Sequence, residues 1–194
     1  MFAKYILNKK EIHLSKIERP KKEKKLPRVI DAEFLATKIS AISNLKHKAI
    51  LTLGLSCGLR ISEVVNLQWE NLDRKRNTLT VINGKGRKDR TAILNNNLIK
   101  LLSDYWREHK TKEYVFSGQF KNQYSQSSIQ NIVKKYIHKK ASFHLLRHSY
   151  ATYALDNGTE LAPLSKSMGH NSTKTTEIYY HTSVKSLKTI KQAI

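Results

Sequence analysis

The chain has 194 residues, of which 39% are hydrophobic, and it carries 36 lysines and arginines against 15 acidic residues. This length suits one ordinary domain with a real core, or such a domain with an appended arm. The formal net charge of +21 raises affinity for polyanions through counterion release. Because the basic residues alternate with apolar ones and form no basic helix with a strong aromatic face, the composition favours nucleic acid over an anionic membrane.

The sequence also argues against membrane spanning, secretion and a zinc cluster. The apolar run at 49–55 is much shorter than the roughly 20 residues that cross a bilayer, and the N-terminus lacks the order of a secretory signal. Cys57 is the single cysteine, so it has no partner for an internal disulfide and no second thiol for a metal cluster. We therefore expect a soluble, cytoplasmic protein in which Cys57 is a small buried hydrophobe.

The N-terminal 28 residues are densely basic and contain two of the three prolines. We predict a basic arm or linker over residues 1–25, followed by a folded domain from about residue 26. A lysine-rich prolyl segment can lie along a DNA backbone or remain a solvated tail, and the sequence favours neither.

From residue 31 the pattern becomes helical. Asp31 is placed to cap a helix through Ile39, and a largely apolar helix follows at about 45–56, closed by Gly58. Another short helix is predicted at 63–67. Arg60 therefore lies at a helix-to-helix junction, where packing can hold its side chain.

The second half of the chain adds a hairpin and more helices. Two short β-branched runs, 79–82 and 91–94, flank a basic loop and predict an antiparallel hairpin. Helices are expected at 98–109, 126–138, 142–156 and 160–168, and another begins after Ser172 and carries Tyr179. A short strand is expected at 114–116. The chain ends in a basic amphipathic segment at 184–194. The predicted fold class is mainly α with a small antiparallel β-sheet, that is, α+β.

Several predicted element ends carry side chains suited to a phosphodiester. Displacing an oxygen at phosphorus needs fixed cationic donors, a nucleophile and an acid for the leaving oxygen. An arginine fork matches two phosphate oxygens and keeps its charge. The candidates are Arg60 and Arg147 as cationic donors, His144 and His170 as neutral or cationic donors, Lys85 on the hairpin loop, and Tyr179 as the attacking group.

Each candidate taken alone also has an ordinary structural explanation. Arg60 could be a surface arginine, Lys85 an exposed hairpin residue, and Tyr179 a core residue with a satisfied hydroxyl. His144 and His148 lie four residues apart, a spacing that can hold zinc on a helix, but no glutamate follows His144 and no third ligand is obvious. The sequence therefore predicts no metal site.

Taken in chain order, these residues resemble the tyrosine site-specific recombinases, the family of the phage integrases and Xer-type recombinases. Residues 57–63 (Cys-Gly-Leu-Arg-Ile-Ser-Glu) resemble the family's first-arginine motif, 84–90 its β-hairpin lysine motif, and 144–147 (His-Leu-Leu-Arg) its second-arginine box. The Gly-His pair at 169–170 and the segment 175–181 resemble its terminal histidine and nucleophile motifs. The resemblance covers about residues 26–183 and implies the catalytic-domain fold of that family.

The resemblance also implies a role for each candidate. Arg60 and Arg147 would clamp the scissile phosphate, and His144 and His170 would hydrogen-bond to it or assist proton transfer. Lys85 would protonate the leaving 5′ oxygen, and Tyr179 would attack to give a 3′-phosphotyrosyl intermediate. Neither ATP, a metal nor another cofactor is then required, because the phosphoryl group is held on the protein and returned to a DNA 5′-hydroxyl.

Some neighbouring residues need a separate assignment. Tyr180 is a rival nucleophile, but the nine-residue offset from His170 and the Tyr-x-His spacing favour Tyr179. The ordinary pKa of a phenol is about 10, so cationic surroundings should help Tyr179 lose its proton. Glu63 and His148 are expected to act in support, Glu63 by orienting a basic group and His148 by packing or hydrogen bonding in its helix.

The resemblance finally implies partners and an activity. Typical members carry an N-terminal core-binding domain, of which residues 1–25 would be the remnant. We expect double-stranded DNA as the partner, no membrane, and a homo-tetramer on DNA, with a monomer left open for the free protein. Segment 184–194 would dock on a neighbouring copy or pack on its own domain. The implied activity is site-specific recombination or integration in a bacterial or phage-encoded protein; a type IB topoisomerase-like nicking-closing enzyme and a non-catalytic DNA-binding regulator are the alternatives.

Overall fold

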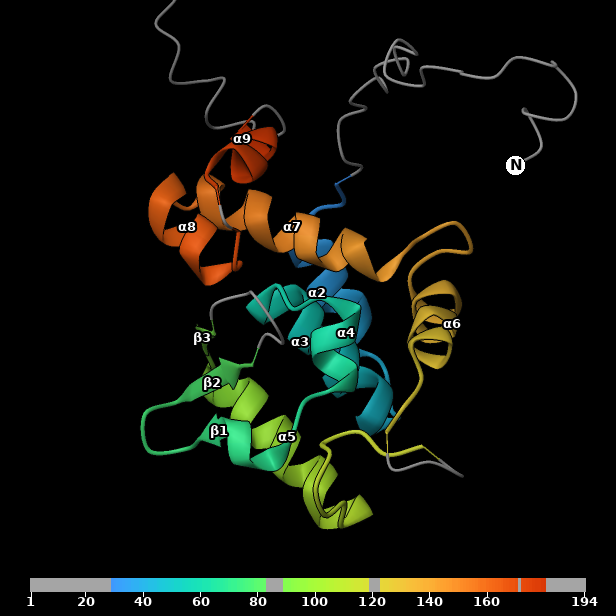
Figure 1. The fold of residues 1–194 in the computed structure, drawn as a ribbon. Helices are drawn as coiled ribbons and strands as arrows, with labels where there is room; N and C mark the ends of the chain where they lie inside the picture. The colour runs from blue at the N-terminus through green and yellow to red at the C-terminus, as the bar shows by residue number, and fades with distance from the viewer. Residues whose placement is uncertain (1–28, 83–88, 119–122, 171, 181–194) are drawn as a thin grey trace, which may run out of the picture.

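The computed structural model describes residues 29–82, 89–118, 123–170 and 172–180. Helices dominate this part of the chain, and a small three-stranded antiparallel sheet lies to one side of them (Figure 1). The predicted fold class is therefore confirmed. The basic arm, Lys85 and the segment 184–194 lie outside the described residues. No helix in the described part has the length and apolar character that a membrane crossing needs.

The described elements are longer helices that form the body, together with several short helices and strands. In chain order they are α2 (Ala32–Ser40), α3 (Leu45–Cys57), α4 (Ile61–Val65), the 3₁₀ helix η2 (Trp69–Asn71), β1 (Leu72–Asp73), β2 (Thr78–Val81), β3 (Arg90–Ile93), α5 (Asn96–His109), α6 (Gln126–Tyr136), α7 (Phe143–Asp156), α8 (Leu161–Ser167) and α9 (Lys174–Tyr180). Most of the helices agree with the sequence prediction to within two or three residues.

Helix α3 is the centre of the main core. It begins where the Asn44 side chain accepts the backbone N–H of His47, and it contacts α2, α5 and α7. These neighbours surround α3, which explains why its sequence is apolar around most of its circumference. Cys57, at its last position, is 2% exposed, as predicted. Gly58 then turns the chain with a φ of +58°, a conformation that favours glycine.

The sheet is built in the order β1-β2-β3, with Leu72 opposite Leu79 and Thr80 opposite Thr91. Strands β2 and β3 each begin one residue before the predicted positions. Strand β1, with two residues, is too short to leave a pattern in the sequence. The strand predicted at 114–116 is wrong: Tyr114 forms a single bridge with Gln68, because this segment pairs with the connection after α4 and not with the sheet.

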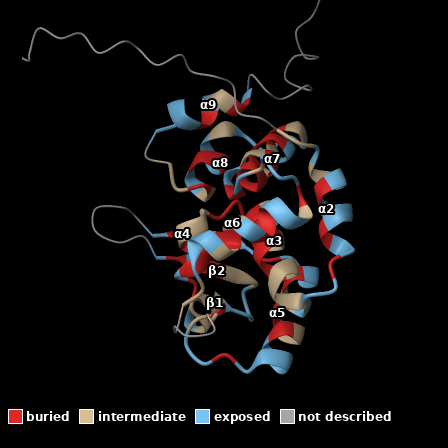
Figure 2. Cartoon of the chain, turned by 90° about the vertical axis from the view of Figure 1, so that its right-hand side faces the viewer, coloured by how far each residue is buried: buried red, intermediate tan, exposed pale blue. Residues whose placement is uncertain are grey.

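Helix α7 joins the main body to a smaller layer formed by α8 and α9. Figure 2 shows α9 at the end of the molecule away from α5 and the sheet, with α8 beside α7. Helix α8 also contacts strand β3. Phe143 and Leu146 of α7 join the main core, whereas Ala151 and Leu155 join a second hydrophobic cluster with Leu164, Met168 and Tyr179. Both faces of α7 are therefore buried, and α9 is attached to the protein largely through this second cluster.

A buried ion pair connects the sheet to both layers. In β3 the inward positions alternate with exposed ones, so Arg90 shares the inner face with Ala92. The Arg90 Nη2 donates to Glu63 Oε2 at 2.7 Å, with side chains 3% and 6% exposed, and its Nη1 donates to the Ser167 carbonyl. Burial alone would raise the pKa of Glu63, but the charge of Arg90 and hydrogen bonds from Arg60 and Arg90 lower it overall.

We predict that Glu63→Gln strongly destabilises the fold, because it leaves the Arg90 charge buried without its carboxylate. Breaking a buried pair in this way costs about 3–5 kcal/mol, which urea denaturation at neutral pH would measure. The control is Asp104→Asn, which breaks the Arg107–Asp104 pair whose side chains are 71% and 36% exposed. That change should cost less than about 1 kcal/mol. An equal loss of unfolding free energy in the two variants would contradict the view that the buried pair stabilises the fold more than the exposed one.

Candidate active site

Arg60 occupies the N-cap position of α4, directly after the Gly58 turn. Its backbone N–H donates to Glu63 Oε2 at 2.7 Å and its Nη1 donates to Glu63 Oε1 at 2.8 Å. Its Nη2 reaches the Gly169 carbonyl at 3.2 Å. Gly169 has a φ of +64°, and a Cβ there would lie 2.7 Å from the Arg90 side chain, so only glycine fits. The Arg60 side chain remains 21% exposed and can still meet a ligand.

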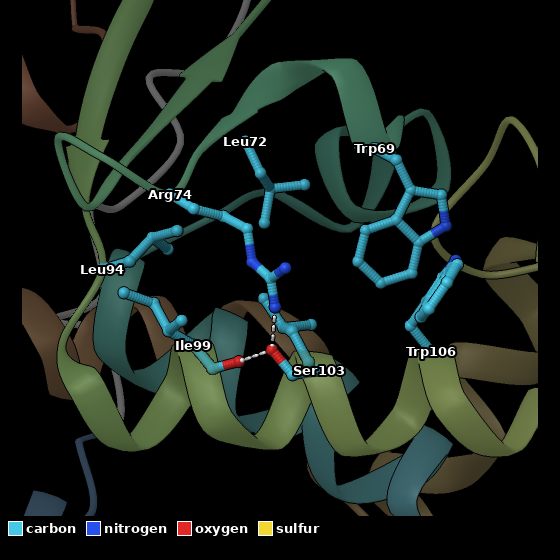
Figure 3. A pocket seen from close by; sticks show the side chains of 8 residues that line it. Trp69, Leu72, Arg74, Leu94, Ile99, Ser103 and Trp106 are labelled. Carbon is cyan, nitrogen blue, oxygen red and sulfur yellow. Dashed lines mark hydrogen bonds between the residues drawn. The ribbon is translucent and has the colours of Figure 1, made fainter.

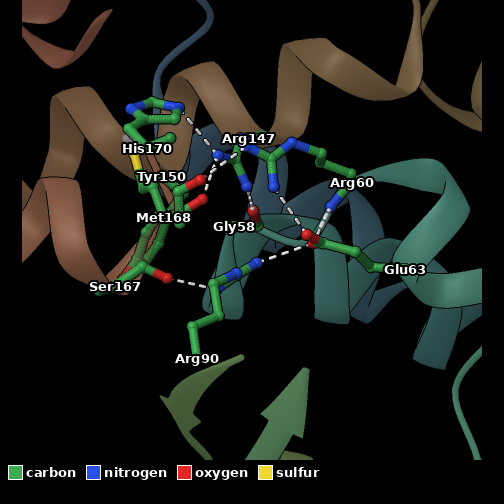
Figure 4. A network of polar contacts seen from close by, with 10 residues as sticks. Gly58, Arg60, Glu63, Arg90, Arg147, Tyr150, Ser167, Met168 and His170 are labelled. Carbon is green, nitrogen blue, oxygen red and sulfur yellow. Dashed lines mark hydrogen bonds and ion pairs between the residues drawn. The ribbon is translucent and has the colours of Figure 1, made fainter. Parts of the chain in front are cut away.

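Arg147 lies in the second turn of α7 and is 2% exposed. Its Nη1 donates to the Gly58 carbonyl, and its Nη2 donates to the Met168 carbonyl at 2.6 Å and to His170 Nε2 at 3.0 Å (Figure 4). Burial, and then repulsion from two neighbouring arginines, lowers the pKa of Arg147 to about 10. The group stays cationic at neutral pH, held in place by backbone acceptors.

Positive charge is in excess in this network. Figure 4 shows Arg60, Arg90 and Arg147 converging near the single carboxylate drawn, that of Glu63. Glu63 bonds to Arg60 and Arg90, whereas Arg147 is satisfied by neutral acceptors. Guanidinium groups held together in a partly buried site repel one another, and a bound anion would relieve this repulsion. The arrangement therefore fits a phosphate group.

His170 connects the arginine network to α9. Because the Arg147 guanidinium can only donate, His170 Nε2 accepts, and the Nδ1–H is left to donate to Thr176 Oγ1 at 2.8 Å. Burial, followed by the charges of Arg147, Arg60 and Arg90, lowers the pKa of His170 to about 4. His170 is therefore neutral at physiological pH, with both ring nitrogens occupied.

Tyr179 is 4% exposed, and its ring belongs to the second hydrophobic cluster. Its hydroxyl lies 2.9 Å from His148 Nδ1, and the two ring centroids are 5.4 Å apart. Burial raises the pKa of Tyr179, and the charges of Arg147 and Arg60 lower it by less. The cations therefore act in the predicted direction, but desolvation outweighs them and the pKa of this phenol is raised overall.

His144 lies one turn before His148 on α7, on the same helix face as Arg147. Its ring centroid is 5.6 Å from that of His148, in a T-shaped arrangement. His144 is exposed at the surface of α7, yet its ring is partly desolvated, and this desolvation, followed by the charges of Arg147 and Arg60, lowers its pKa. Because His144 and Arg147 lie on the same face of α7, a ligand bound by the arginine network would lie near His144.

The structure brings five sequence-predicted site residues together and leaves one undescribed. Arg60, Arg147 and His170 belong to one polar network, and His144 and Tyr179 both contact His148. Lys85 lies outside the described residues. Their catalytic roles stay predictions.

Two groups at this site, Arg90 and His148, have contacts that the sequence does not predict. The motif resemblance places Arg90 only at the end of the hairpin motif. In β3, however, buried and exposed residues alternate, and this alternation puts Arg90 on the inner face with Ala92. For His148 the sequence predicts packing or hydrogen bonding in its helix. The ring does pack against His144 of the same helix, but its hydrogen-bond partner Tyr179 is 31 residues away on α9. No local pattern in the sequence indicates that contact.

An apolar pocket of about 240 Å³ lies elsewhere, between the β1 region and α5 (Figure 3). Its lining includes Trp69, Leu72 and Trp106, and Arg74 donates a hydrogen bond to Ser103 Oγ within it. No described candidate residue lines this pocket. Within the described ranges, no three histidine, cysteine or acidic side chains converge as metal ligands would. The charged network is therefore the candidate site.

Acid should weaken the fold through His148 and His170. Both have a pKa of about 4 in the folded protein against an ordinary value of 6.5, so the unfolded chain takes up these protons first as the pH falls. Their stabilising contribution is complete above the unfolded pKa and is lost as the pH falls through the folded one. Each histidine should lower the free energy of unfolding by about 1–2 kcal/mol between pH 7 and pH 5. Urea denaturation at both pH values measures this, and His148→Asn should show a smaller decrease; an equal decrease would contradict the assignment.

A known protein family and several known proteins are similar to this chain. Residues 28–186 match the model of the phage integrase family. The tyrosine recombinase XerC of Caldanaerobacter subterraneus subsp. tengcongensis is 40% identical over 145 residues, which cover 69% of this chain and 40% of that protein. The tyrosine recombinase XerA of Pyrococcus horikoshii is 32% identical over 180 residues, which cover 89% of this chain and 63% of that protein.

A crystal structure of XerA recombinase has the same fold, with a TM-score of 0.73 and 29% identity over 84% of this chain and 64% of that one. The chain thus spans less than two thirds of the length of these relatives. The family match nevertheless covers most of this chain, and it confirms the resemblance inferred from the order of the motifs. The chain belongs to the phage integrase family, to which its similarity to tyrosine recombinases XerC and XerA also points.

Proposed function

We propose that this chain cleaves and rejoins DNA strands at specific sites, through a covalent 3′-phosphotyrosyl intermediate on Tyr179. The observation that carries this proposal is the phenol hydroxyl of Tyr179, which bonds to His148, the residue next to Arg147, and feels the charges of Arg147 and Arg60. Those arginines belong to a cluster in which positive charge is in excess. Such a cluster suits the scissile phosphate, and the phenol suits a nucleophile that stays attached to the protein. The family membership and the net charge of +21 support DNA as the substrate.

In this proposal the arginines bind the non-bridging oxygens of the phosphate. Arg60 is partly exposed, and Arg147 is fixed by the carbonyls of Gly58 and Met168 and by His170. Negative charge grows on these oxygens in the transition state, and donors that are already oriented stabilise it without further reorganisation. His144 and His170 lie next to these arginines and would contribute hydrogen bonds or assist proton transfer.

The bond changes balance without a cofactor. The Tyr179 oxygen forms a bond to phosphorus while the bond from phosphorus to the DNA 5′ oxygen breaks. The leaving 5′ oxygen takes a proton, for which we propose Lys85 as donor. Rejoining reverses these steps, as a DNA 5′-hydroxyl attacks the phosphotyrosine and the phenol leaves.

Assembly and targeting belong to the same proposal. A homo-tetramer on DNA, with segment 184–194 docking between copies or packing on its own domain, stays a prediction, as does the role of residues 1–25 as a remnant of a core-binding domain. The alternatives of a nicking-closing enzyme and of a non-catalytic DNA-binding protein have no specific observation in their favour.

We predict that Tyr179→Phe abolishes covalent attachment to DNA, because the variant lacks the attacking oxygen. The protein would be incubated with a pool of nicked duplexes of randomised sequence, and denaturant-resistant protein–DNA adducts would be detected by gel electrophoresis. Tyr180→Phe is the matched control: this neighbouring tyrosine is 51% exposed, and its loss should leave the adduct intact. An adduct that survives in the Tyr179 variant would refute the assignment.

Binding to DNA should depend steeply on salt, because phosphate contacts release counterions. A protein that neutralises four phosphates loses about 100-fold in affinity when the salt concentration rises fourfold. Fluorescence anisotropy with a labelled duplex at several salt concentrations measures the slope. Nanomolar affinity that does not change with salt would contradict the expected reliance on the phosphate backbone.

A further inference from the structure

We propose that His148 is the general base of this site, accepting the proton of the Tyr179 hydroxyl during strand cleavage and returning it during rejoining. This inference rests on the proposed function and adds a residue to it. The carrying observation is geometric: His148 Nδ1 lies 2.9 Å from the hydroxyl oxygen of Tyr179. A general base must be within hydrogen-bond reach of the proton it removes.

Packing fixes this contact on both sides. His148 lies on α7 directly after Arg147, whose side chain is held by three hydrogen bonds. Tyr179 is anchored on α9 by the second hydrophobic cluster, and Thr176, one turn before it, bonds to His170. The His148 and Tyr179 rings are inclined by 48° with centroids 5.4 Å apart. The acceptor is therefore in place before the phosphate is attacked.

The direction of the hydrogen bond follows from the protonation state. Burial, and then the charges of His144 and Arg147, lowers the pKa of His148 to about 4, so its ring is neutral at physiological pH. A neutral imidazole nitrogen is a better acceptor than a phenol oxygen, and a phenol is the better donor. The Tyr179 hydroxyl therefore donates to the His148 Nδ1 lone pair, and the ring hydrogen lies on Nε2.

A base is needed here because the phenol is buried. Burial raises the pKa of Tyr179 despite the nearby cations. As the tyrosine oxygen attacks, its O–H bond breaks and the proton passes to His148 Nδ1, while the oxygen electrons form the bond to phosphorus. The electrons of the breaking phosphorus–oxygen bond remain on the 5′ oxygen, which the separate acid protonates. In rejoining, the imidazolium returns its proton to the departing phenolate.

The surroundings of His148 fit this role better than those of His170. Both nitrogens of His170 are occupied, one by Arg147 and one by Thr176, so His170 has no free lone pair. His148 also lines a groove of about 560 Å³ together with His138 and Lys140, which gives its ring a route for proton exchange.

The titratable and charged groups that face His148 belong to three parts of the chain. His144 and Arg147 lie on α7, and Tyr179 lies on α9. His138 and Lys140 line the same groove from the connection between α6 and α7. Any pH dependence attributed to His148 has to be separated from the titration of these neighbours, which a comparison of wild type and His148 variants achieves.

The test measures single-turnover formation of the Tyr179–DNA adduct on the pool of nicked duplexes. His148→Asn keeps a hydrogen-bond acceptor for the tyrosine but cannot take its proton. We expect adduct formation at pH 7 to slow by about 10²–10⁴-fold, the usual contribution of a general base. In the variant the rate should rise about tenfold per pH unit, because the phenol must then lose its proton to solvent. The wild-type rate should be nearly flat over the same interval.

Chemical rescue separates a base from a structural contact. Imidazole in solution should restore part of the rate of His148→Ala, because it supplies the missing acceptor in the space left by the ring. The matched control is His47→Asn, since His47 Nδ1 lies 3.2 Å from the Tyr136 hydroxyl in a similar pair outside the site. That variant should keep the wild-type rate to within about twofold.

The outcomes distinguish this inference from the function on which it rests. If wild type forms no Tyr179 adduct, the proposed function fails and the base assignment fails with it. If wild type forms the adduct and His148→Asn matches its rate, only the base assignment is overturned. A slow His148→Asn variant without the steeper pH dependence, combined with no imidazole rescue of His148→Ala, overturns it as well. Urea denaturation identifies a folding defect, and the nearly isosteric asparagine variant carries the test if the alanine variant does not fold.

Discussion

The buried guanidinium of Arg147 is the group on which the site depends. A cation removed from water must have its donors satisfied, and those of Arg147 bond to the carbonyls of Gly58 and Met168 and to His170. These acceptors lie at the end of α3 and at the connection from α8 to α9. The hydrogen-bond donors of Arg147 therefore fix the end of α3 and the α8–α9 connection relative to α7. The same hydrogen bonds hold both the fold and the site.

A second group of charges extends this constraint to the sheet. Arg90 of β3 and Arg60, the N-cap residue of α4, share the Glu63 carboxylate, which connects the hairpin strand to the helical body. Three guanidinium groups near one carboxylate are unfavourable for the fold alone. The same excess of positive charge favours binding of a phosphate. Repulsion between the guanidinium groups therefore lowers the stability of the free protein but strengthens anion binding.

The neutral histidines connect the chemistry to the attachment of α9. His170 donates a hydrogen bond to Thr176 and His148 accepts one from Tyr179, so two hydrogen bonds that involve histidine rings hold the helix that carries the nucleophile. Both rings are neutral because they are partly buried beside cations. Protonating them would disturb the position of the nucleophile and remove the lone pair assigned to the base, so the stability of α9 and catalysis should respond to acid together.

The sequence alone determined the basic charge, the fold class, the main helices, the hairpin and the order of the motifs, because caps, periodicity and spacing are local properties. It placed Arg60, Arg147 and Tyr179 at element ends or on helices where the structure also has them. Only the tertiary structure decided the partners of Arg90, the contact between His148 and Tyr179, and the upward shift of the Tyr179 pKa. Desolvation and long-range contacts depend on what packs against a side chain, and packing between distant segments leaves no local pattern in the sequence.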